Sequence, residues 1–191
     1  MAQAKLPTRF GIFDMAIFQS DDEQKEHIAL IKGNLQDPQG TLVRIHSECL
    51  TGDTLYSKRC DCGEQLQKTF KMINKAKTGM IIYLRQEGRG IGLLNKIKAY
   101  QLQDKGLDTI EANEQLGLPA DMRRYDIALE IFHHFKIKKI RLLTNNPEKM
   151  HELVPVIQIV KRVPLEVKPN SVNRKYLRTK KQRFGHILKN V

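Results

Sequence analysis

Hydrophobic and polar positions along the chain follow two periods. Runs rich in β-branched and aromatic residues predict strands near 8–18, 26–33, 41–46, 79–85, 139–144 and 156–163. Apolar residues with helical spacing predict helices near 63–76, 92–105, 109–117, 124–136, 147–154 and 173–189. From about residue 62 onward the two kinds of element alternate. The pattern therefore predicts an α/β fold, a mixed β-sheet core with flanking helices, in a single domain over residues 1–191.

Two of the predicted helices contain informative positions. Asn146 precedes Pro147, which suits the first position of a helix, so Asn146 is a natural helix cap. Tyr100 lies seven positions after Leu93 and three after Ile97. This spacing puts it on the apolar face of its helix, and periodicity alone therefore favours a core tyrosine.

The net charge of +12 is concentrated near the carboxyl end of the chain. Residues 161–191 contain ten Lys or Arg and one acid, whereas residues 1–160 contain 23 basic and 20 acidic residues. The basic tail begins at about residue 170. Only two aromatic residues, Tyr176 and Phe184, stand among these basic residues, fewer than an interleaved stacking platform for bases requires. We therefore favour a solvated helix or a frayed terminus over a nucleic-acid surface.

The apolar runs are short. The run 80–84 is an example, far below the roughly 20 residues that a membrane-spanning helix needs. The amino terminus has no apolar targeting core, and an odd number of cysteines argues against a disulfide framework. We therefore expect a cytoplasmic protein in a reducing compartment.

All three cysteines, Cys49, Cys60 and Cys62, fall within fourteen positions. Residues two apart in an extended segment point to the same side, so Cys60 and Cys62 can bind the same metal ion. Three soft ligands without a fourth are typical of a catalytic zinc ion, which keeps one position for water or substrate. The spacing permits this and does not prove it, because cysteines also serve as small buried hydrophobic residues.

Two further segments have features of anion sites. The apolar run 80–84 leads into the glycine-rich stretch 85–92 and then a predicted helix, an arrangement that can cradle phosphate. An ordinary strand-to-helix turn explains the same pattern, since the spacing matches no established phosphate motif. At the start of the helix near 147, Thr144 and Lys149 are free to face an anion.

Several of these stretches, taken in order, resemble the GTP cyclohydrolase II family. The ordered set is highly specific and covers most of the chain. The matching stretches are 44–53, 59–63, 85–89, 91–96, 108–109, 111–113, 142–147 and 185–186.

The resemblance implies a metal site, a substrate site and three catalytic residues. It implies Cys49, Cys60 and Cys62 as ligands of one zinc ion per subunit, and Mg²⁺ bound with the GTP phosphates. The implied GTP-binding residues are Arg44, Ile45, His46, Ser47, Glu48, Gln65, Glu87, Gly88, Arg89, Thr109, Thr144 and Lys149.

The family converts GTP to formate, pyrophosphate and 2,5-diamino-6-ribosylamino-4(3H)-pyrimidinone 5′-phosphate, the first step of riboflavin biosynthesis. By resemblance, Tyr100 orients the purine or transfers a proton, Asp121 accepts a proton, and Arg123 is a nucleophile at the α-phosphorus. Guanidinium is protonated near neutrality, so an electrostatic clamp is the simpler role for Arg123. Both roles stay open on the sequence.

The resemblance also implies a homodimer, and a single domain predicts a monofunctional enzyme. Two features depart from the family pattern: Arg124 stands where an acidic residue is common, and the stretch 177–180 is unusually basic. Arg124 could alter how Asp121 and Arg123 share charge. Two alternatives remain at this stage, a catalytically silent GTP-binding relative and a zinc-containing nucleic-acid-binding module.

Overall fold

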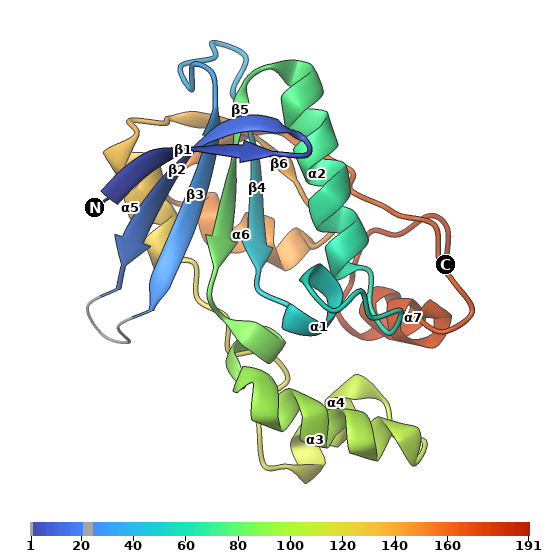
Figure 1. The fold of residues 1–191 in the computed structure, drawn as a ribbon. Coiled ribbons are helices and arrows are strands. Elements are labelled where there is room, and N and C mark those ends of the chain that lie inside the picture. Colours follow the sequence, from blue (N-terminus) through green and yellow to red (C-terminus); the bar gives the residue numbers. More distant parts are fainter. Residues whose placement is uncertain (1, 21–24) are drawn as a thin grey trace.

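A seven-stranded sheet forms the centre of the computed structural model, which describes residues 2–20 and 25–191 (Figure 1). The strand order is β1-β2-β3-β5-β4-β6-β7. The strands are β1 (Ala2–Thr8), β2 (Gly11–Gln19), β3 (Glu26–Lys32), β4 (Thr41–Ser47), β5 (Gly79–Leu84), β6 (Lys139–Leu143) and β7 (Gln158–Val163).

The sheet is mixed, as the sequence predicts. Strands β1, β2, β3 and β5 pair antiparallel, whereas β5, β4, β6 and β7 pair parallel. Parallel neighbours end at the same edge of a sheet, and ligands of α/β proteins commonly bind there. The carboxyl ends of β4, β5 and β6 therefore identify the edge where a site is expected.

All six predicted helices are present, and two short helical turns are additional. The helical elements are α1 (Leu50–Asp53), α2 (Cys62–Ala76), η1 (Glu87–Gly90), α3 (Gly92–Asp104), α4 (Thr109–Gln115), α5 (Asp126–His134), α6 (Pro147–Leu153) and α7 (Arg174–Arg183). The predicted cap is confirmed, because the Asn146 side chain accepts a hydrogen bond from the backbone N–H of Glu148 at 3.1 Å. No described helix is long and apolar enough to cross a membrane.

Apolar side chains fill the space on both faces of the sheet. On one face, Ile45 and Ile82 pack with Ile131 and Leu153 from α5 and α6. On the other face, Ile81 packs with Ile73 of α2. Burial of these side chains supplies the main driving force for this arrangement. The sheet is thus a rigid support from which loops and helices project.

Helices α3 and α4 lie beyond the end of the sheet rather than over one of its faces (Figure 1). Leu93 and Ile97 of α3 are 38% and 41% exposed, so the apolar stripe of this helix does not face the core. The prediction that Tyr100 is a core residue is therefore wrong. Periodicity identified a face of the helix correctly but could not show what that face contacts.

The basic tail is ordered and packs against the rest of the chain. Asn173 and Leu177 are buried, so the expectation of a frayed terminus is wrong for this part of the chain. The predicted helix over 173–189 ends at Arg183, because Gly185 adopts a left-handed conformation with φ 62°. The solvated face is confirmed, since Arg174, Lys175, Arg178 and Lys181 are exposed.

Candidate active site

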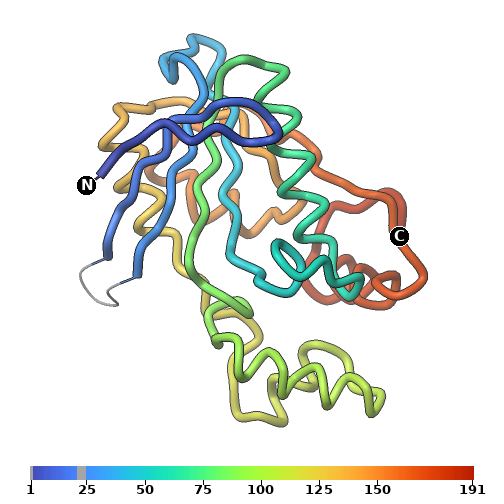
Figure 2. The backbone as a smooth tube through the Cα atoms, in the orientation of Figure 1, coloured from blue at the N-terminus to red at the C-terminus, as the bar shows by residue number. Residues whose placement is uncertain are grey.

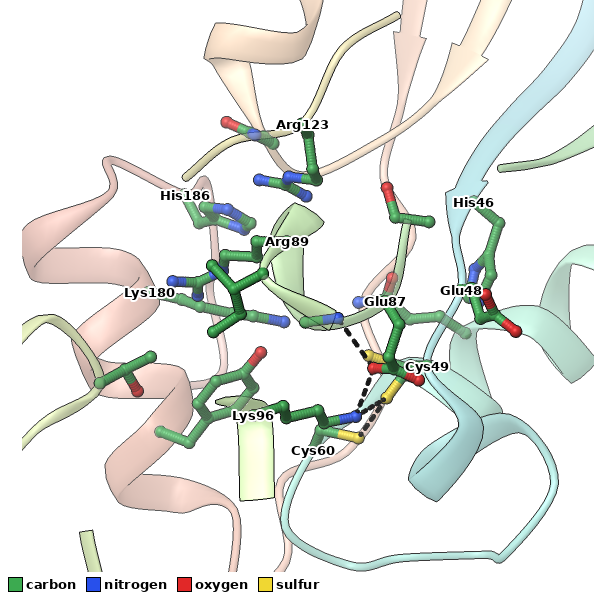
Figure 3. A pocket seen from close by; sticks show the side chains of 18 of the residues that line it. His46, Glu48, Cys49, Cys60, Glu87, Arg89, Lys96, Arg123, Lys180 and His186 are labelled. Atoms are coloured by element: carbon green, nitrogen blue, oxygen red, sulfur yellow. Dashed lines mark hydrogen bonds and ion pairs between the residues drawn. The ribbon is translucent and has the colours of Figure 1, made fainter. Parts of the chain in front are cut away.

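A pocket lies at the carboxyl ends of β4, β5 and β6, with residues from α3, α4 and α7 around it (Figure 3). Segments far apart in the sequence therefore meet here. The residues predicted from the sequence that line the pocket are Arg44, His46, Ser47, Glu48, Cys49, Cys60, Cys62, Gln65, Glu87, Gly88, Arg89, Tyr100, Thr109, Arg123, Thr144 and Lys149. Two predicted residues do not line it, Ile45 and Asp121.

The three cysteines form one cluster, here called the cysteine cluster (Cys49, Cys60 and Cys62). Their Sγ atoms all lie within 4.8 Å of one another, and the Sγ atoms of Cys49 and Cys60 are 3.7 Å apart. The close approach of α1 and the start of α2 makes this possible. A Cβ on Gly63 would lie 2.1 Å from the carbonyl oxygen of Gly52, so only glycine fits between them.

The donor set of the cysteine cluster fits a zinc ion that keeps an open fourth position. Hydrogen bonds from Cys60 and Cys62 lower the pKa of the Cys49 thiol, and Lys96 adds to this effect. Cys49 is therefore stabilised as a thiolate, the form in which cysteine binds metal. The same contacts raise the pKa of Cys60 and Cys62, so without a metal the cluster shares one negative charge. Among the residues that the structure describes, it is the one group of three or more Cys, His, Asp or Glu side chains placed to hold a metal ion.

Lys96 of α3 connects the cysteine cluster to η1. Its Nζ donates to Cys49 Sγ at 3.2 Å, to Thr51 Oγ1 at 2.8 Å and to Glu87 Oε1 at 2.8 Å (Figure 3). Burial lowers the pKa of Lys96, but Cys49 and Glu87 more than offset this and raise it above its ordinary value. Lys96 is therefore a cation held between two anionic partners.

Glu87 fixes the glycine-rich stretch against the first turn after Cys49. Its Oε2 accepts from the backbone N–H of Leu50 at 2.6 Å. The following residues, Gly88 and Arg89, both have positive φ, 63° and 61°. A left-handed conformation is strained for arginine, so the surrounding contacts must hold Arg89 in place. The sequence prediction of a strand, a tight turn and a helix over 80–105 is confirmed.

His46 belongs to a buried network at the end of β4. Its Nε2 lies 3.0 Å from Asp53 Oδ2, which also accepts from the Tyr83 hydroxyl at 2.9 Å and from the backbone N–H of Cys49 at 3.0 Å. Burial lowers the pKa of His46 despite the neighbouring carboxylate. Asp53 thus links His46 to the backbone of Cys49 and holds Cys49 in place.

Two further buried cations line the pocket, Arg44 and Lys149, and are called here the unpaired cations. Arg44 donates from Nη2 to Gln65 Oε1 at 2.8 Å and from Nη1 to the Leu143 carbonyl at 3.0 Å, and its buried Nε has no partner among the described residues. Lys149 Nζ donates to the Ile45 carbonyl oxygen at 2.9 Å.

Neither unpaired cation has a carboxylate within ion-pair distance in the part of the chain that the structure describes. Burial lowers the pKa of both side chains. The nearby positive charges of Arg44 and Arg123 lower the pKa of Lys149 further. Buried charges are normally paired. These two side chains are therefore suited to receive an anionic ligand.

Arg123 and Asp121 form an ion pair in the loop before α5. Arg123 Nε donates to Asp121 Oδ1 at 2.8 Å, and its Nη2 donates to Asp121 Oδ2. Burial lowers the pKa of Arg123, but Asp121 offsets this and raises it above the ordinary value. Arg124 turns away and donates to Asp126 at 2.8 Å. Arg124 therefore pairs with Asp126 and takes no part in the ion pair between Asp121 and Arg123.

Tyr100 and Thr109 enter the pocket from α3 and α4. Burial raises the pKa of the Tyr100 hydroxyl to about 12, so the hydroxyl is protonated at neutral pH. The guanidinium of Arg59 lies 4.8 Å from the centre of its ring. Thr109 is the first residue of α4, which begins with a capping box between Asp108 and Glu111.

Sequence reasoning assigned no role to several residues that line the pocket. The lining residues without a predicted role include Lys96, Asn113, Asn145, Tyr176, Lys180 and His186. Four of them, Lys96, Asn113, Asn145 and His186, stand inside stretches that carried the resemblance, and this was the available signal for them. Nothing in the local pattern of the tail indicated Tyr176 or Lys180, because their place depends on long-range packing.

Comparisons with known proteins agree with this geometry. The family model of GTP cyclohydrolase II matches residues 1–164. A "GTP cyclohydrolase-2" from Hahella chejuensis is 56% identical over 98% of this chain and 91% of its own length. A second, from Shewanella oneidensis, is 53% identical over 98% of this chain and 93% of its own length.

One solved structure has a distant likeness, a two-domain 3,4-dihydroxy-2-butanone 4-phosphate synthase from A. baumannii. It is 16% identical, with a TM-score of 0.47 over 83% of this chain and 39% of that one. This likeness is too weak to carry an argument. The family model and the relatives at more than half identity are sufficient, and the chain belongs to the GTP cyclohydrolase II family.

Proposed function

We propose that this protein is a zinc-dependent GTP cyclohydrolase II. It uses water to convert GTP to formate, pyrophosphate and 2,5-diamino-6-ribosylamino-4(3H)-pyrimidinone 5′-phosphate, the first step of riboflavin biosynthesis. The observation that carries the proposal is one pocket that contains both a three-cysteine cluster and buried cations without a carboxylate partner among residues 2–20 and 25–191. The first feature suits a hydrolytic metal, and the second suits a polyphosphate.

The cysteine cluster is the proposed zinc site, with one ion per subunit held by Cys49, Cys60 and Cys62. A zinc ion held there would lower the pKa of a bound water and supply the nucleophile for opening the guanine ring at C8. The chain's own contribution is to fix the ligands. Lys96 donates to Cys49 Sγ at 3.2 Å, and Asp53 accepts from the Cys49 backbone at 3.0 Å.

Tyr100 is the proposed proton donor to the purine. Its hydroxyl keeps its proton at neutral pH, since burial raises its pKa to about 12. A neutral phenol can donate a hydrogen bond to a ring nitrogen and give up its proton as the ring opens. Lys96 Nζ, 5.8 Å from the Tyr100 ring centre, stabilises the resulting phenolate electrostatically.

Arg123 is proposed to be an electrostatic clamp on the α-phosphate. The bidentate contact with Asp121 raises its pKa and keeps the guanidinium protonated, which opposes its use as a nucleophile. Asp121 is then a positioning partner that orients Arg123, while it remains a candidate proton acceptor. Negative charge that develops as pyrophosphate departs would be stabilised by Arg123.

The remaining predicted residues are proposed to bind GTP. Arg44 and Lys149 would receive the phosphates, and Arg89 and Thr144 would add donors at the same edge of the sheet. Mg²⁺ is proposed to bind between the phosphate oxygens, which it prefers as ligands. The other proposed GTP-binding residues are Ile45, His46, Ser47, Glu48, Gln65, Glu87, Gly88 and Thr109.

The deciding experiment follows all three products together. The purified, zinc-loaded protein is incubated with GTP and Mg²⁺, and formate, pyrophosphate and the pyrimidine are measured by mass spectrometry and phosphorus NMR. We expect equal amounts of all three. Pyrophosphate without formate would refute the zinc step, and saturable GTP binding without any product would identify a catalytically silent relative.

We also propose a homodimer, a cytoplasmic location and a single catalytic domain over residues 1–191. The exposed apolar side chains of Leu93, Leu94 and Ile97 on α3 support the first. The three free cysteines suit a reducing compartment. Sedimentation equilibrium at several concentrations tests the dimer, and a monomer at all of them would contradict it.

A further inference from the structure

The C-terminal segment, residues 173–188, forms one side of the pocket although it lies beyond the region matched by the family model. At one end it contacts the loop that holds two of the cysteines. The Asn173 side chain donates to the Cys60 carbonyl oxygen at 3.3 Å, and Lys180 Nζ donates to Asp61 Oδ1 at 2.7 Å. Figure 2 shows the segment beside that loop, next to the start of α2.

The other end of the segment is tied to the carboxyl end of β6. The backbone N–H of Ile187 donates to the Asn145 carbonyl oxygen at 2.8 Å, and that of His186 donates to the Lys180 carbonyl oxygen at 3.1 Å. Leu188 is buried. The segment therefore spans the pocket from the cysteine cluster to β6, and residues 184–186 are held between two fixed points.

Phe184 contacts Arg89, one of the proposed GTP-binding residues. The guanidinium carbon of Arg89 lies 4.1 Å from the centre of the Phe184 ring, a cation–π contact. Nη1 of Arg89 is buried and has no hydrogen-bond partner among residues 2–20 and 25–191. The aromatic ring thus supports the guanidinium from one side and leaves a donor for a ligand.

His186 points into the same part of the pocket, near Arg89 and Arg123 (Figure 3). Its ring has no ion-pair or hydrogen-bond partner in the described part of the chain. Burial, followed by the positive charges of Lys180, Arg123 and Arg89, lowers its pKa to about 3, so the ring is neutral in the free protein. Three cations and one imidazole that share a space provide several donors for a ligand with many anionic oxygens.

We infer that His186 contacts the phosphate chain of the bound nucleotide, and that Phe184 is a positioning residue that holds Arg89 against the same phosphates. The identity of the nucleotide rests on the proposed function, whereas the contact with a polyphosphate rests on the geometry. The C-terminal segment is then part of the substrate site and not only a basic surface.

Pyrophosphate binding to the full-length, zinc-loaded protein tests the inference by isothermal titration calorimetry. Loss of one hydrogen bond to a charged group weakens binding by about tenfold or more, so we expect that change for His186→Asn. Guanosine affinity and zinc content stay at the wild-type values. His186→Gln, which keeps an N–H donor on a longer side chain, recovers part of the loss.

Arg178→Gln is the matched control. Arg178 lies on the exposed side of α7, so this variant removes a full positive charge from the same segment without touching the pocket. We expect wild-type pyrophosphate affinity. An equal loss of pyrophosphate affinity in Arg178→Gln and His186→Asn would overturn the inference. It would show that the net charge of the tail, and not a contact made by His186, determines the affinity.

Phe184 is tested through its dependence on Arg89. Phe184→Leu is expected to weaken pyrophosphate binding severalfold in the wild-type background and to add nothing in an Arg89→Gln background. Additive effects would overturn its positioning role. If His186→Asn does not fold, nitrogen NMR of the wild-type His186 ring decides, and a ring signal unaffected by saturating pyrophosphate would overturn the contact.

These measurements separate the inference from the proposed function. Wild-type protein that binds pyrophosphate through His186 but releases no formate would refute the cyclohydrolase proposal and keep the phosphate contact. Protein that releases formate normally in His186→Asn, with unchanged KM and pyrophosphate affinity, would refute the contact and keep the cyclohydrolase proposal.

Discussion

The buried cations that line the pocket fall into two groups, which differ in whether a carboxylate lies within ion-pair distance. Beside the cysteine cluster, Lys96 lies 2.8 Å from Glu87 and Lys180 lies 2.7 Å from Asp61. Near β6, Arg44 and Lys149 are equally buried and have no such partner in the described part of the chain. The paired cations are balanced without a ligand. The unpaired cations lack such an ion-pair partner among the described residues, so the comparison distinguishes side chains that build the site from those proposed to receive the substrate.

The largest expected effect comes from the cysteine cluster itself. Cys60→Ser removes a ligand whose Sγ lies 3.7 Å from that of Cys49, so we expect zinc loss and formate release below detection. Metal content, circular dichroism and formate are measured on the same sample. A folded, zinc-free variant with normal formate release would contradict the assignment.

The second prediction concerns a paired cation. Lys96→Met leaves Glu87, whose side chain is 10% exposed, as a buried carboxylate without its cation. Breaking a buried ion pair from one side costs about 3 kcal/mol, and we expect that decrease in the free energy of unfolding by urea. Lys98→Met, at an exposed position of the same helix, is the control and should change stability by less than about 0.5 kcal/mol.

The third prediction concerns an unpaired cation and makes the contrast sharper. Lys149→Met removes a buried charge for which the described chain offers no carboxylate partner, and it loses one hydrogen bond to the Ile45 carbonyl. The two effects oppose each other, so we expect unfolding free energy within about 1 kcal/mol of the wild type. GTP affinity should fall by about tenfold or more. A loss of stability as large as that of Lys96→Met would contradict the distinction between the paired and the unpaired cations.

The fourth prediction concerns the pH dependence of stability. The pKa of His186 is lowered from its ordinary 6.5 to about 3 by burial and then by Lys180, Arg123 and Arg89, while Asp61 opposes the shift. Below pH 6.5 the unfolded chain therefore binds a proton that the folded chain does not, and stability falls as the pH falls toward 3. His186→Gln should show a smaller decrease between pH 7 and pH 5 in urea denaturation. An unchanged decrease would show that other groups cause it.

The smallest effect is expected at Arg124. Its side chain is 73% exposed and pairs with Asp126, which is 64% exposed, so Arg124→Gln should change stability by less than about 0.5 kcal/mol. Its guanidinium is turned away from Asp121, and kcat should match the wild type. A clear change in kcat would mean that Arg124 does alter how Asp121 and Arg123 share charge.

The elements that the sequence predicted well are those whose pattern reflects burial. The parallel strand β5 is a nearly continuous apolar run, and β4 alternates apolar residues with Arg44 and His46, so both were recognisable as strands from their pattern. Strand β1 was missed because it is almost wholly exposed and contains Pro7, so neither alternation nor apolar content identifies it. Its strand structure comes from pairing with β2, which only the folded chain provides.

Prediction of the site had a similar limit. Motif resemblance brought Cys49 and Lys149 to one site although a hundred residues separate them, because a resemblance contains tertiary information that spacing lacks. Lys180 was read as part of a solvated tail. Its burial depends on Asp61, 119 positions earlier, and no local pattern connects the two. Tyr176 and Lys180 were therefore visible as pocket residues only in the structure.

The position of the C-terminal segment also affects the order in which the molecule is assembled. Ribosomes make the strands of the sheet and the cysteine cluster first, and residues 173–188 emerge after every other part of the pocket. The core can collapse while the pocket still lacks Lys180 and His186. A nascent chain would therefore complete its nucleotide site only after the strands of the sheet and the cysteine cluster have been made.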